Sequence, residues 1–137
     1  MSQIFTKLTF STLSQSFIDI TKDIQDEIYK HQIENGLLNL SILHTSCSLL
    51  IQENADITVQ EDIKIFLAQL APEKTYLHES EGPDDMPAHL KTLLTQTHLS
   101  LSFQNKKIIL GTWQGIFLLE HRSSDRLRNV QFHIIGD

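Results

Sequence analysis

The sequence contains very little cysteine and no long apolar run. Cys47 is the single cysteine among 137 residues, so the chain cannot form an internal disulfide bond. A thiol without a partner is typical of a reducing compartment, and the first ten residues do not resemble a signal peptide. No stretch approaches the roughly 18 apolar residues that a membrane span needs. We therefore expect a cytoplasmic protein without a membrane partner.

Positive charge is also scarce. Seventeen acidic residues outnumber eleven basic ones, which gives a net charge of −6. This balance argues against sequence-independent binding of nucleic acid, which requires a broad basic surface. Small phosphorylated molecules remain candidate ligands, because a few local cationic groups can hold them. Histidine, by contrast, is plentiful, with seven residues, and it is the common metal ligand and proton carrier near neutral pH.

The hydrophobic pattern predicts one α+β domain over residues 1–137. Alternating apolar residues predict strands near 4–10, 38–42, 48–51, 99–103, 108–110, 116–120 and 130–135. Helical spacing predicts helices over 20–28, between 56 and 72, and over 87–96. Helices lie among the early strands and hairpins close the chain, which favours an α+β fold over a doubly wound α/β fold.

Three local details of this fold can be predicted. Asp56 is the expected N-cap of the second helix, whose buried stripe is expected to be Val59, Ile63, Phe66, Leu67 and Leu70. Segments 38–42 and 48–51 are expected to pair as neighbouring strands. The acidic segment 73–86 is expected to be a loop with a short strand at 76–78.

Two polar clusters flank the strand at 48–51. Segment 44–48 places His44, three hydroxyls and a thiol at one corner, where hydroxyls and turn amides can hold an anion and imidazole can bind metal or move a proton. A self-capping turn is the alternative. Cys47 is interpreted as a buried filler, since a nucleophile requires a lowered pKa. Glu53 follows the strand, where a carboxylate is either functional or an ordinary cap.

Segment 78–89 carries the most chemistry. It holds four carboxylates and two histidines, His78 and His89, around one Gly-Pro turn. Such a loop is costly unless its charges are solvated, paired or bound to a cation. Histidine with carboxylate suits Zn²⁺ or another first-row divalent metal, and carboxylates with water suit Mg²⁺. A solvated acidic loop is the alternative.

A further cluster lies in the last third of the chain. Trp113 stands between two glycines, where an indole can wall a pocket or fill the core. Arg122 can clamp a carboxylate or a phosphate, or it can form a surface ion pair.

These motifs, in this order, resemble the YjbQ family, also called the secondary thiamine-phosphate synthase family, over essentially the whole chain. The motifs are His44-Thr45-Ser46-x-Ser48, Glu53-Asn54-x-Asp56, Tyr76-x-His78, Glu81-Gly82-x-Asp84-Asp85-Met86-Pro87-x-His89, Gly111-Thr112-Trp113-Gln114-Gly115 and Glu120-His121-Arg122. Cys47 stands where a smaller residue is expected, and Ile57 replaces an expected proline.

The resemblance implies a β-sandwich-like core, a homotrimer, and a metal or anion site at His44, His78 and His89. It also implies weak thiamine-phosphate synthesis, in which hydroxymethylpyrimidine diphosphate and thiazole phosphate are joined and pyrophosphate is released. The expected cofactor is a divalent metal, Zn²⁺ or Mg²⁺. The expected catalytic residues are His89, Asp84, Asp85 and Glu53. The expected substrate-binding residues are Thr45, Ser46, Ser48, Asn54, Lys91, Trp113, Gln114, Glu120 and Arg122.

Two other functions fit the same residues. A metal-dependent hydrolase of phosphate esters would use the site to activate water. A trimeric module that holds a small anion or a metal would need no catalysis.

Overall fold

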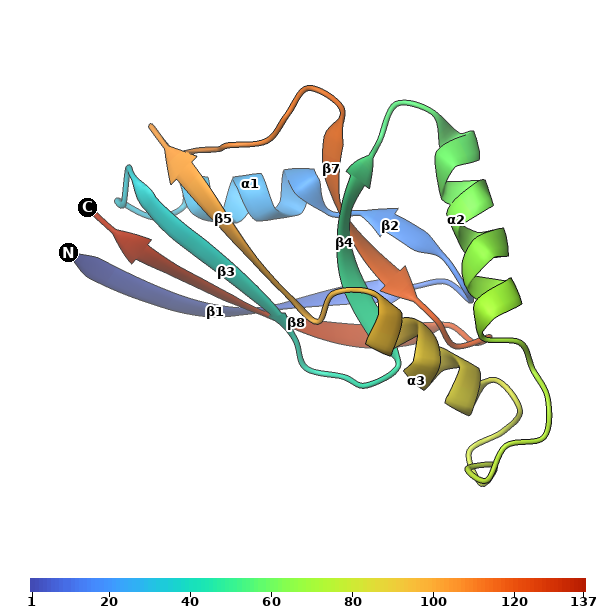
Figure 1. The fold of residues 1–137 in the computed structure, drawn as a ribbon. Coiled ribbons are helices and arrows are strands. Elements are labelled where there is room, and N and C mark those ends of the chain that lie inside the picture. Colours follow the sequence, from blue (N-terminus) through green and yellow to red (C-terminus); the bar gives the residue numbers. More distant parts are fainter.

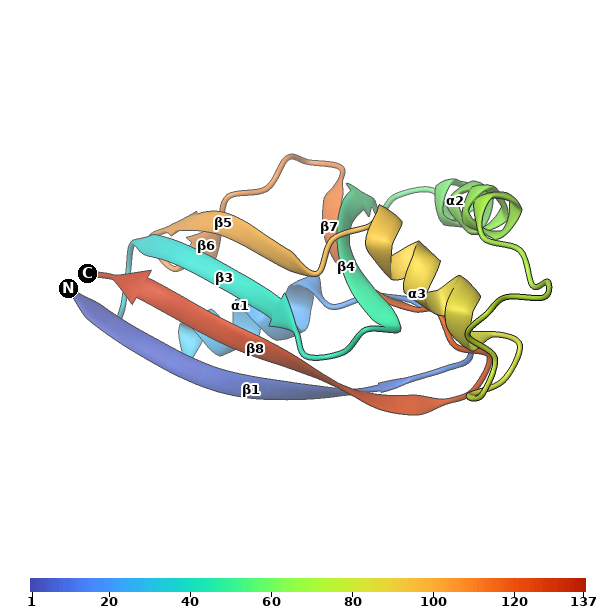
Figure 2. The same ribbon diagram turned by 60° about the horizontal axis from the view of Figure 1, so that its bottom comes forward.

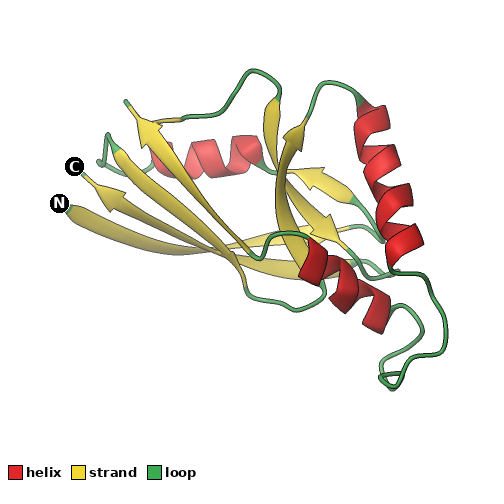
Figure 3. Ribbon diagram, viewed as in Figure 1, coloured by secondary structure: helices red, strands yellow, loops and turns green.

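The structure is a computed structural model that describes residues 1–137. The chain forms three helices and eight strands, whose arrangement is shown in Figures 1 and 3. Their order is β1 (Ser2–Thr12), β2 (Phe17–Asp19), α1 (Thr21–Tyr29), β3 (Gly36–Ile42), β4 (Cys47–Glu53), α2 (Ile57–Leu70), α3 (Asp85–Leu94), β5 (His98–Gln104), β6 (Lys107–Ile108), β7 (Gln114–Glu120) and β8 (Arg126–Gly136).

The strands form two antiparallel sheets. The larger has the order β1-β8-β3-β5-β6, and the smaller has the order β2-β7-β4. One continuous core of 16 buried residues draws on both sheets and on α1. In β8, Val130, Phe132 and Ile134 point into this core while the residues between them are more exposed, as the two-residue period of a strand requires. The predicted α+β fold with a two-sheet, antiparallel core is confirmed.

The small sheet and the two later helices form one end of the molecule. Figure 2 shows α2 and α3 beyond β4, at the opposite end from the two termini. Asp56 caps α2 as predicted, because its Oδ1 accepts a hydrogen bond of 2.9 Å from the Thr58 amide. The hairpin between β5 and β6 turns at Asn105 and Lys106, which both have positive φ, as tight hairpin turns require.

Three local predictions were wrong. The segments at 38–42 and 48–51 do not pair, because β3 lies between β5 and β8 while β4 pairs with β7 in the other sheet. No strand forms at 76–78, where the chain is irregular. In α2 only Gln60 and Leu67 are buried, so most of the expected apolar stripe is not covered within one chain; Phe66 and Leu70 are more than half exposed.

The third helix begins earlier than the sequence indicated. It starts at Asp85 rather than Pro87, so Asp85 and His89 stand one helical turn apart on the same face. No helix in the structure has both the length and the apolar character needed to cross a bilayer.

Candidate functional site

Two histidines and one aspartate meet at the start of α3. His78 approaches from the preceding loop, and Asp85 and His89 come from the helix itself. The Nε2 atoms of His78 and His89 lie 2.6 and 3.2 Å from Oδ2 of Asp85. One ligand atom from each residue lies within 4.8 Å of the other two. We call this group the His–Asp–His cluster.

Neighbouring groups fix the orientation of two of its members. Nδ1 of His89 donates a hydrogen bond of 2.8 Å to the Thr45 carbonyl, so in the neutral ring the lone pair is on Nε2, toward the cluster. Oδ1 of Asp85 accepts a hydrogen bond of 2.9 Å from Arg122, which leaves Oδ2 for the two imidazoles. Such outer partners are the usual means of orienting metal ligands.

Arg122 also holds the acidic loop against the end of β7. Its Nε donates to Oδ2 of Asp84 and its Nη2 donates to the Glu81 carbonyl, each at 2.9 Å. Burial alone raises the pKa of Asp84, but the bonds from Arg122 and from Ser123 outweigh it and hold that pKa far below its ordinary value. The sequence suggested that Arg122 clamps a substrate. In the structure its guanidinium is engaged with the loop instead.

Asp85 carries a negative charge at neutral pH. Its burial raises the pKa, but the hydrogen bond from His78 and the charges of His89 and Arg122 together lower it below its ordinary value. A buried, ionised carboxylate beside two imidazoles is the donor set that Zn²⁺ and other first-row divalent cations prefer. Three protein ligands with one partly exposed side match the pattern of catalytic centres, which keep a coordination position open.

His44 does not join this cluster. Its Nε2 accepts a hydrogen bond of 2.8 Å from the Asn129 amide, which occupies the lone pair that a metal would need. Burial, with the nearby charge of Arg128, lowers the pKa of His44. The ring instead lines an open hollow of about 410 Å³ together with Thr45 and His89. The three-histidine site predicted from the sequence therefore becomes a two-histidine, one-aspartate site.

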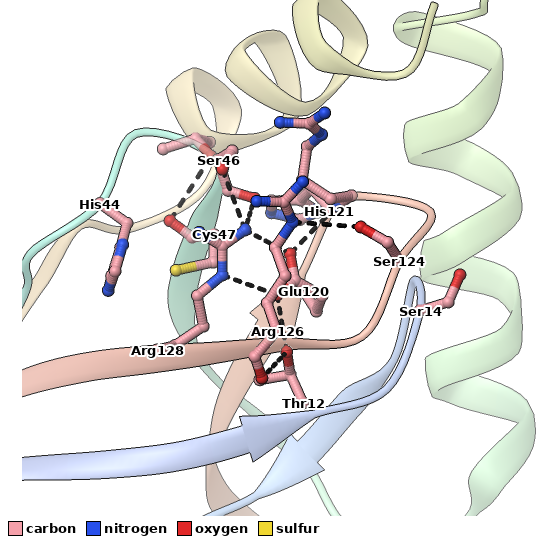
Figure 4. Close-up of polar contacts among 12 residues, drawn as sticks. Thr12, Ser14, His44, Ser46, Cys47, Glu120, His121, Ser124, Arg126 and Arg128 are labelled. Atoms are coloured by element: carbon pink, nitrogen blue, oxygen red, sulfur yellow. Dashed lines mark hydrogen bonds and ion pairs between the residues drawn. The ribbon is translucent and has the colours of Figure 1, made fainter. Parts of the chain in front are cut away.

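A buried ion pair occupies the place where substrate-binding residues were expected. Glu120 accepts hydrogen bonds from Nε and Nη2 of Arg128 at 2.6 and 2.5 Å and from Thr12 at 2.7 Å. Nη2 of Arg128 also donates to Oγ of Ser46 (Figure 4). Glu120 is 1% exposed and Arg128 is 4% exposed. Glu120 and Ser46 therefore join β7, β8 and the 44–48 corner inside the protein.

Ser48 and Cys47 are enclosed as well. Oγ of Ser48 shares a hydrogen bond of 2.8 Å with Nε2 of His121, and Ser48 is fully buried. Burial raises the pKa of the Cys47 thiol to about 12, so this cysteine stays protonated at neutral pH and is a filler, as expected. The structure does not support contact between Ser48 and a substrate.

Glu53, Asn54, Trp113 and Gln114 lie at the other end of the small sheet. In the register of β4 and β7, Glu53 pairs with Gln114, while Cys47 pairs with Glu120, next to Arg122. Six residue-to-residue steps along the extended strand, from Cys47 to Glu53, separate these two ends by about 20 Å. Trp113 is 64% exposed, and Oε2 of Glu53 is inaccessible without a hydrogen-bond partner. Within one chain these four residues are not brought to the His–Asp–His cluster.

Lys91 points away from the cluster. Two residues beyond His89 on α3, it lines a separate cavity with His121 and residues of α2. The sequence pattern assigned no role to His121, which appeared only within a motif, and gave no indication of Lys64 or Phe17 on the same cavity wall. These residues meet only through packing of α2 against β2 and β7, and no local motif marks that contact.

Together, these features define a small two-sheet α+β domain with a candidate divalent-metal centre at the start of its third helix. The chain belongs to the YjbQ-like family UPF0047, whose model matches residues 6–137. The UPF0047 protein of Synechocystis sp. is 42% identical over 132 residues, which cover 95% of this chain and 90% of that protein. YjbQ of Escherichia coli O157:H7 is 41% identical and covers 95% of this chain and 96% of its own.

Solved structures agree with the fold. A conserved protein from Thermus thermophilus superimposes with a TM-score of 0.84 at 36% identity, covering 95% of this chain and 99% of its own. A YjbQ-like protein from Sulfolobus solfataricus P2 gives a TM-score of 0.91, with 99% of both chains covered. At 23% identity, the second match demonstrates the shared fold.

Proposed function

We propose that this protein is a divalent-metal-dependent enzyme that acts on small phosphorylated molecules, with thiamine-phosphate-synthase-like transfer as its candidate reaction. The observation that carries the proposal is the His–Asp–His cluster, whose ligand atoms lie within 4.8 Å of one another. His78, Asp85 and His89 would hold the cation. When bound, it would supply positive charge opposite a leaving pyrophosphate or a phosphoryl oxygen.

The side chains of the adjoining hollow would bind the substrate. His44, Thr45 and Thr97 line this hollow next to His89, so hydroxyl and imidazole groups are available to a phosphate beside the cluster. Arg122 would act through Asp85, by holding its carboxylate in place. We expect these reactions to take place in the cytoplasm.

Metal binding is the first test. Purified wild-type protein should bind close to one equivalent of Zn²⁺ or Mn²⁺ per chain in titration calorimetry, and His89→Ala and Asp85→Asn should each lose most of the affinity. His98→Ala, an exposed histidine on β5, is the matched control and should bind as the wild type does. Equal binding by all four proteins would contradict the proposed centre.

Activity separates the candidate reactions. Release of pyrophosphate that requires both hydroxymethylpyrimidine diphosphate and thiazole phosphate supports the transferase. Release of phosphate from a simple aryl phosphate, without a second substrate, supports the hydrolase. Binding of metal with neither reaction supports a module that only binds. In the first two cases His89→Ala should abolish the activity that the wild type shows.

We further propose that the chain forms a homotrimer. The partly exposed apolar stripe of α2 supports this, since Phe66 is 58% and Leu70 is 53% exposed, and a second copy would remove that surface from water. Light scattering coupled to size exclusion should report three chains for the wild type and one chain for Phe66→Glu. A monomeric wild type would rule out the assembly.

A further inference from the structure

A second cavity lies between α2, α3 and the small sheet, apart from the His–Asp–His cluster. It has a volume of about 240 Å³, which equals the liquid volume of about eight water molecules. α2 lies beside β2 and close to α3 around this space (Figures 1 and 2). The nine lining residues are Gln15, Phe17, Lys64, Ile65, Leu67, Ala68, Lys91, Glu120 and His121.

The charged groups of this cavity are positive on balance. Lys64 and Lys91 enter it from two different helices, and neither forms an ion pair in the chain. Glu120 also lines it, but its carboxylate is already neutralised by Arg128. Two ammonium groups that enter one hollow, whose only carboxylate is already paired with Arg128, form an attractive site for an anion.

Lys91 is the more informative of the two lysines. It is half-buried, and placing an ammonium group in such a position costs free energy unless a counter-charge accompanies it. Glu73 and Asp84 act on its charge from a neighbouring hollow without forming an ion pair with it, and a bound anion would add a direct counter-charge. The ring of Phe17 holds the Lys64 side chain in place. Nζ of Lys64 lies 5.1 Å from the centroid of that ring, within reach of a cation–π interaction.

The remaining lining gives the cavity an apolar side and a polar end. Phe17, Leu67 and Ala68 form the apolar side. His121 is 3% exposed, its Nε2 is bonded to Ser48, and its Nδ1 has no hydrogen-bond partner in the chain. Apolar walls with a few converging polar groups are the usual composition of small-molecule sites.

We propose that this cavity, which we call the Lys64–Lys91 pocket, binds a small anionic molecule that carries an apolar group. Its carboxylate or phosphate would pair with the two ammonium groups, and its apolar part would lie against Phe17, Leu67 and Ala68. The pocket is a binding site separate from the His–Asp–His cluster, since Lys91 and His89 lie on different sides of α3 and line different hollows.

The test uses phenyl phosphate and benzoate as probes on metal-free, full-length protein, so that no cation in the His–Asp–His cluster contributes. Calorimetry or amide shifts in NMR should show saturable binding of at least one probe, and the tighter of the two identifies the charged group. Benzyl alcohol lacks the charge and inorganic phosphate lacks the ring, so each should bind much more weakly. No binding of either probe at millimolar concentration would overturn the proposal.

Two variants test the location. Lys91→Gln keeps a polar side chain, one atom shorter, and removes the charge, and it should weaken binding about tenfold, the effect of one lost charged hydrogen bond. Ala68→Phe fills the cavity from an exposed position on α2 and should abolish binding. Lys107→Gln, exposed on β6, is the control. If Lys91→Gln and Ala68→Phe both bind like the control, the site lies elsewhere and the proposal fails.

Discussion

The buried pair of Glu120 and Arg128 leads to a quantitative prediction for Glu120→Gln. This change keeps the size of the side chain and removes its charge. Arg128, which is 4% exposed, would keep only Ser46 and an uncharged amide as acceptors. Breaking a buried ion pair from one side typically costs about 3–5 kcal/mol of unfolding free energy, and we expect a loss near the lower end because glutamine retains one acceptor oxygen.

The same loss can be expressed as a change in melting temperature. For a chain of 137 residues the unfolding entropy is about 0.3 kcal/mol per degree. A loss of about 3 kcal/mol therefore lowers the melting temperature by about 10 °C. Urea unfolding and thermal unfolding, both followed by circular dichroism, measure the two quantities on the same protein.

A double-mutant cycle decides whether the pair is the cause. Arg128→Met alone should also destabilise, because it leaves Glu120 charged and buried. The double variant Glu120→Gln, Arg128→Met should lose less than the sum of the two single losses by at least about 1 kcal/mol, since it leaves no unpaired buried charge. Additive losses, or a loss below about 1 kcal/mol for Glu120→Gln, would refute the reasoning.

Three more predictions follow from individual contacts. Burial lowers the pKa of His121 to about 4. Between that pH and 6.5, His121 is therefore protonated in the unfolded chain and neutral in the folded chain. Stability should therefore fall by up to roughly 3 kcal/mol as the pH drops from 6.5 to 4, and urea titrations should show this part of the loss disappearing in His121→Gln. Gly36→Ala would place Cβ 2.1 Å from the Ile135 carbonyl, which should cost at least about 2 kcal/mol in the same assay. Arg122→Met should weaken Zn²⁺ binding about 10- to 100-fold in calorimetry, because it removes the group that orients Asp85.

The sequence predicted which segments form helices and strands better than it predicted which strands pair with one another. Periodicity located each helix and most strands because it reflects burial on one side of an element. The expected pairing of β3 with β4 rested instead on the tendency of strands that are neighbours in sequence to pair. Here the chain crosses instead from one sheet to the other at the 44–48 corner, and pairing is decided by residues far along the chain.

The candidate site shows the same division between local and distant contacts. His89 and Asp85 could be identified as candidate ligands because they are four residues apart in the sequence. The helix was expected to begin at Pro87, after Asp85, so the sequence did not predict that the two residues share one helical face. The roles of Arg122 and Glu120 could not be predicted. Each is a charged residue near the end of a strand, and whether it faces a ligand or a buried counter-ion depends on where Asp85 and Arg128 lie.

The topology places a limit on any centre that uses all the motif residues. The register of β4 and β7 fixes Glu53 and Trp113 at one end of the small sheet, and the His–Asp–His cluster lies beyond the other. Side-chain rotation cannot bridge a separation of about 20 Å. A reaction that needed Glu53 beside His89 would therefore require two copies of the chain. The Glu53 end of the small sheet in one copy would have to lie against the His–Asp–His cluster of the other copy. Metal binding needs no such contact, because His78, Asp85 and His89 come from one loop and one helix. A variant that remains monomeric should thus keep its metal affinity, whatever happens to its catalysis.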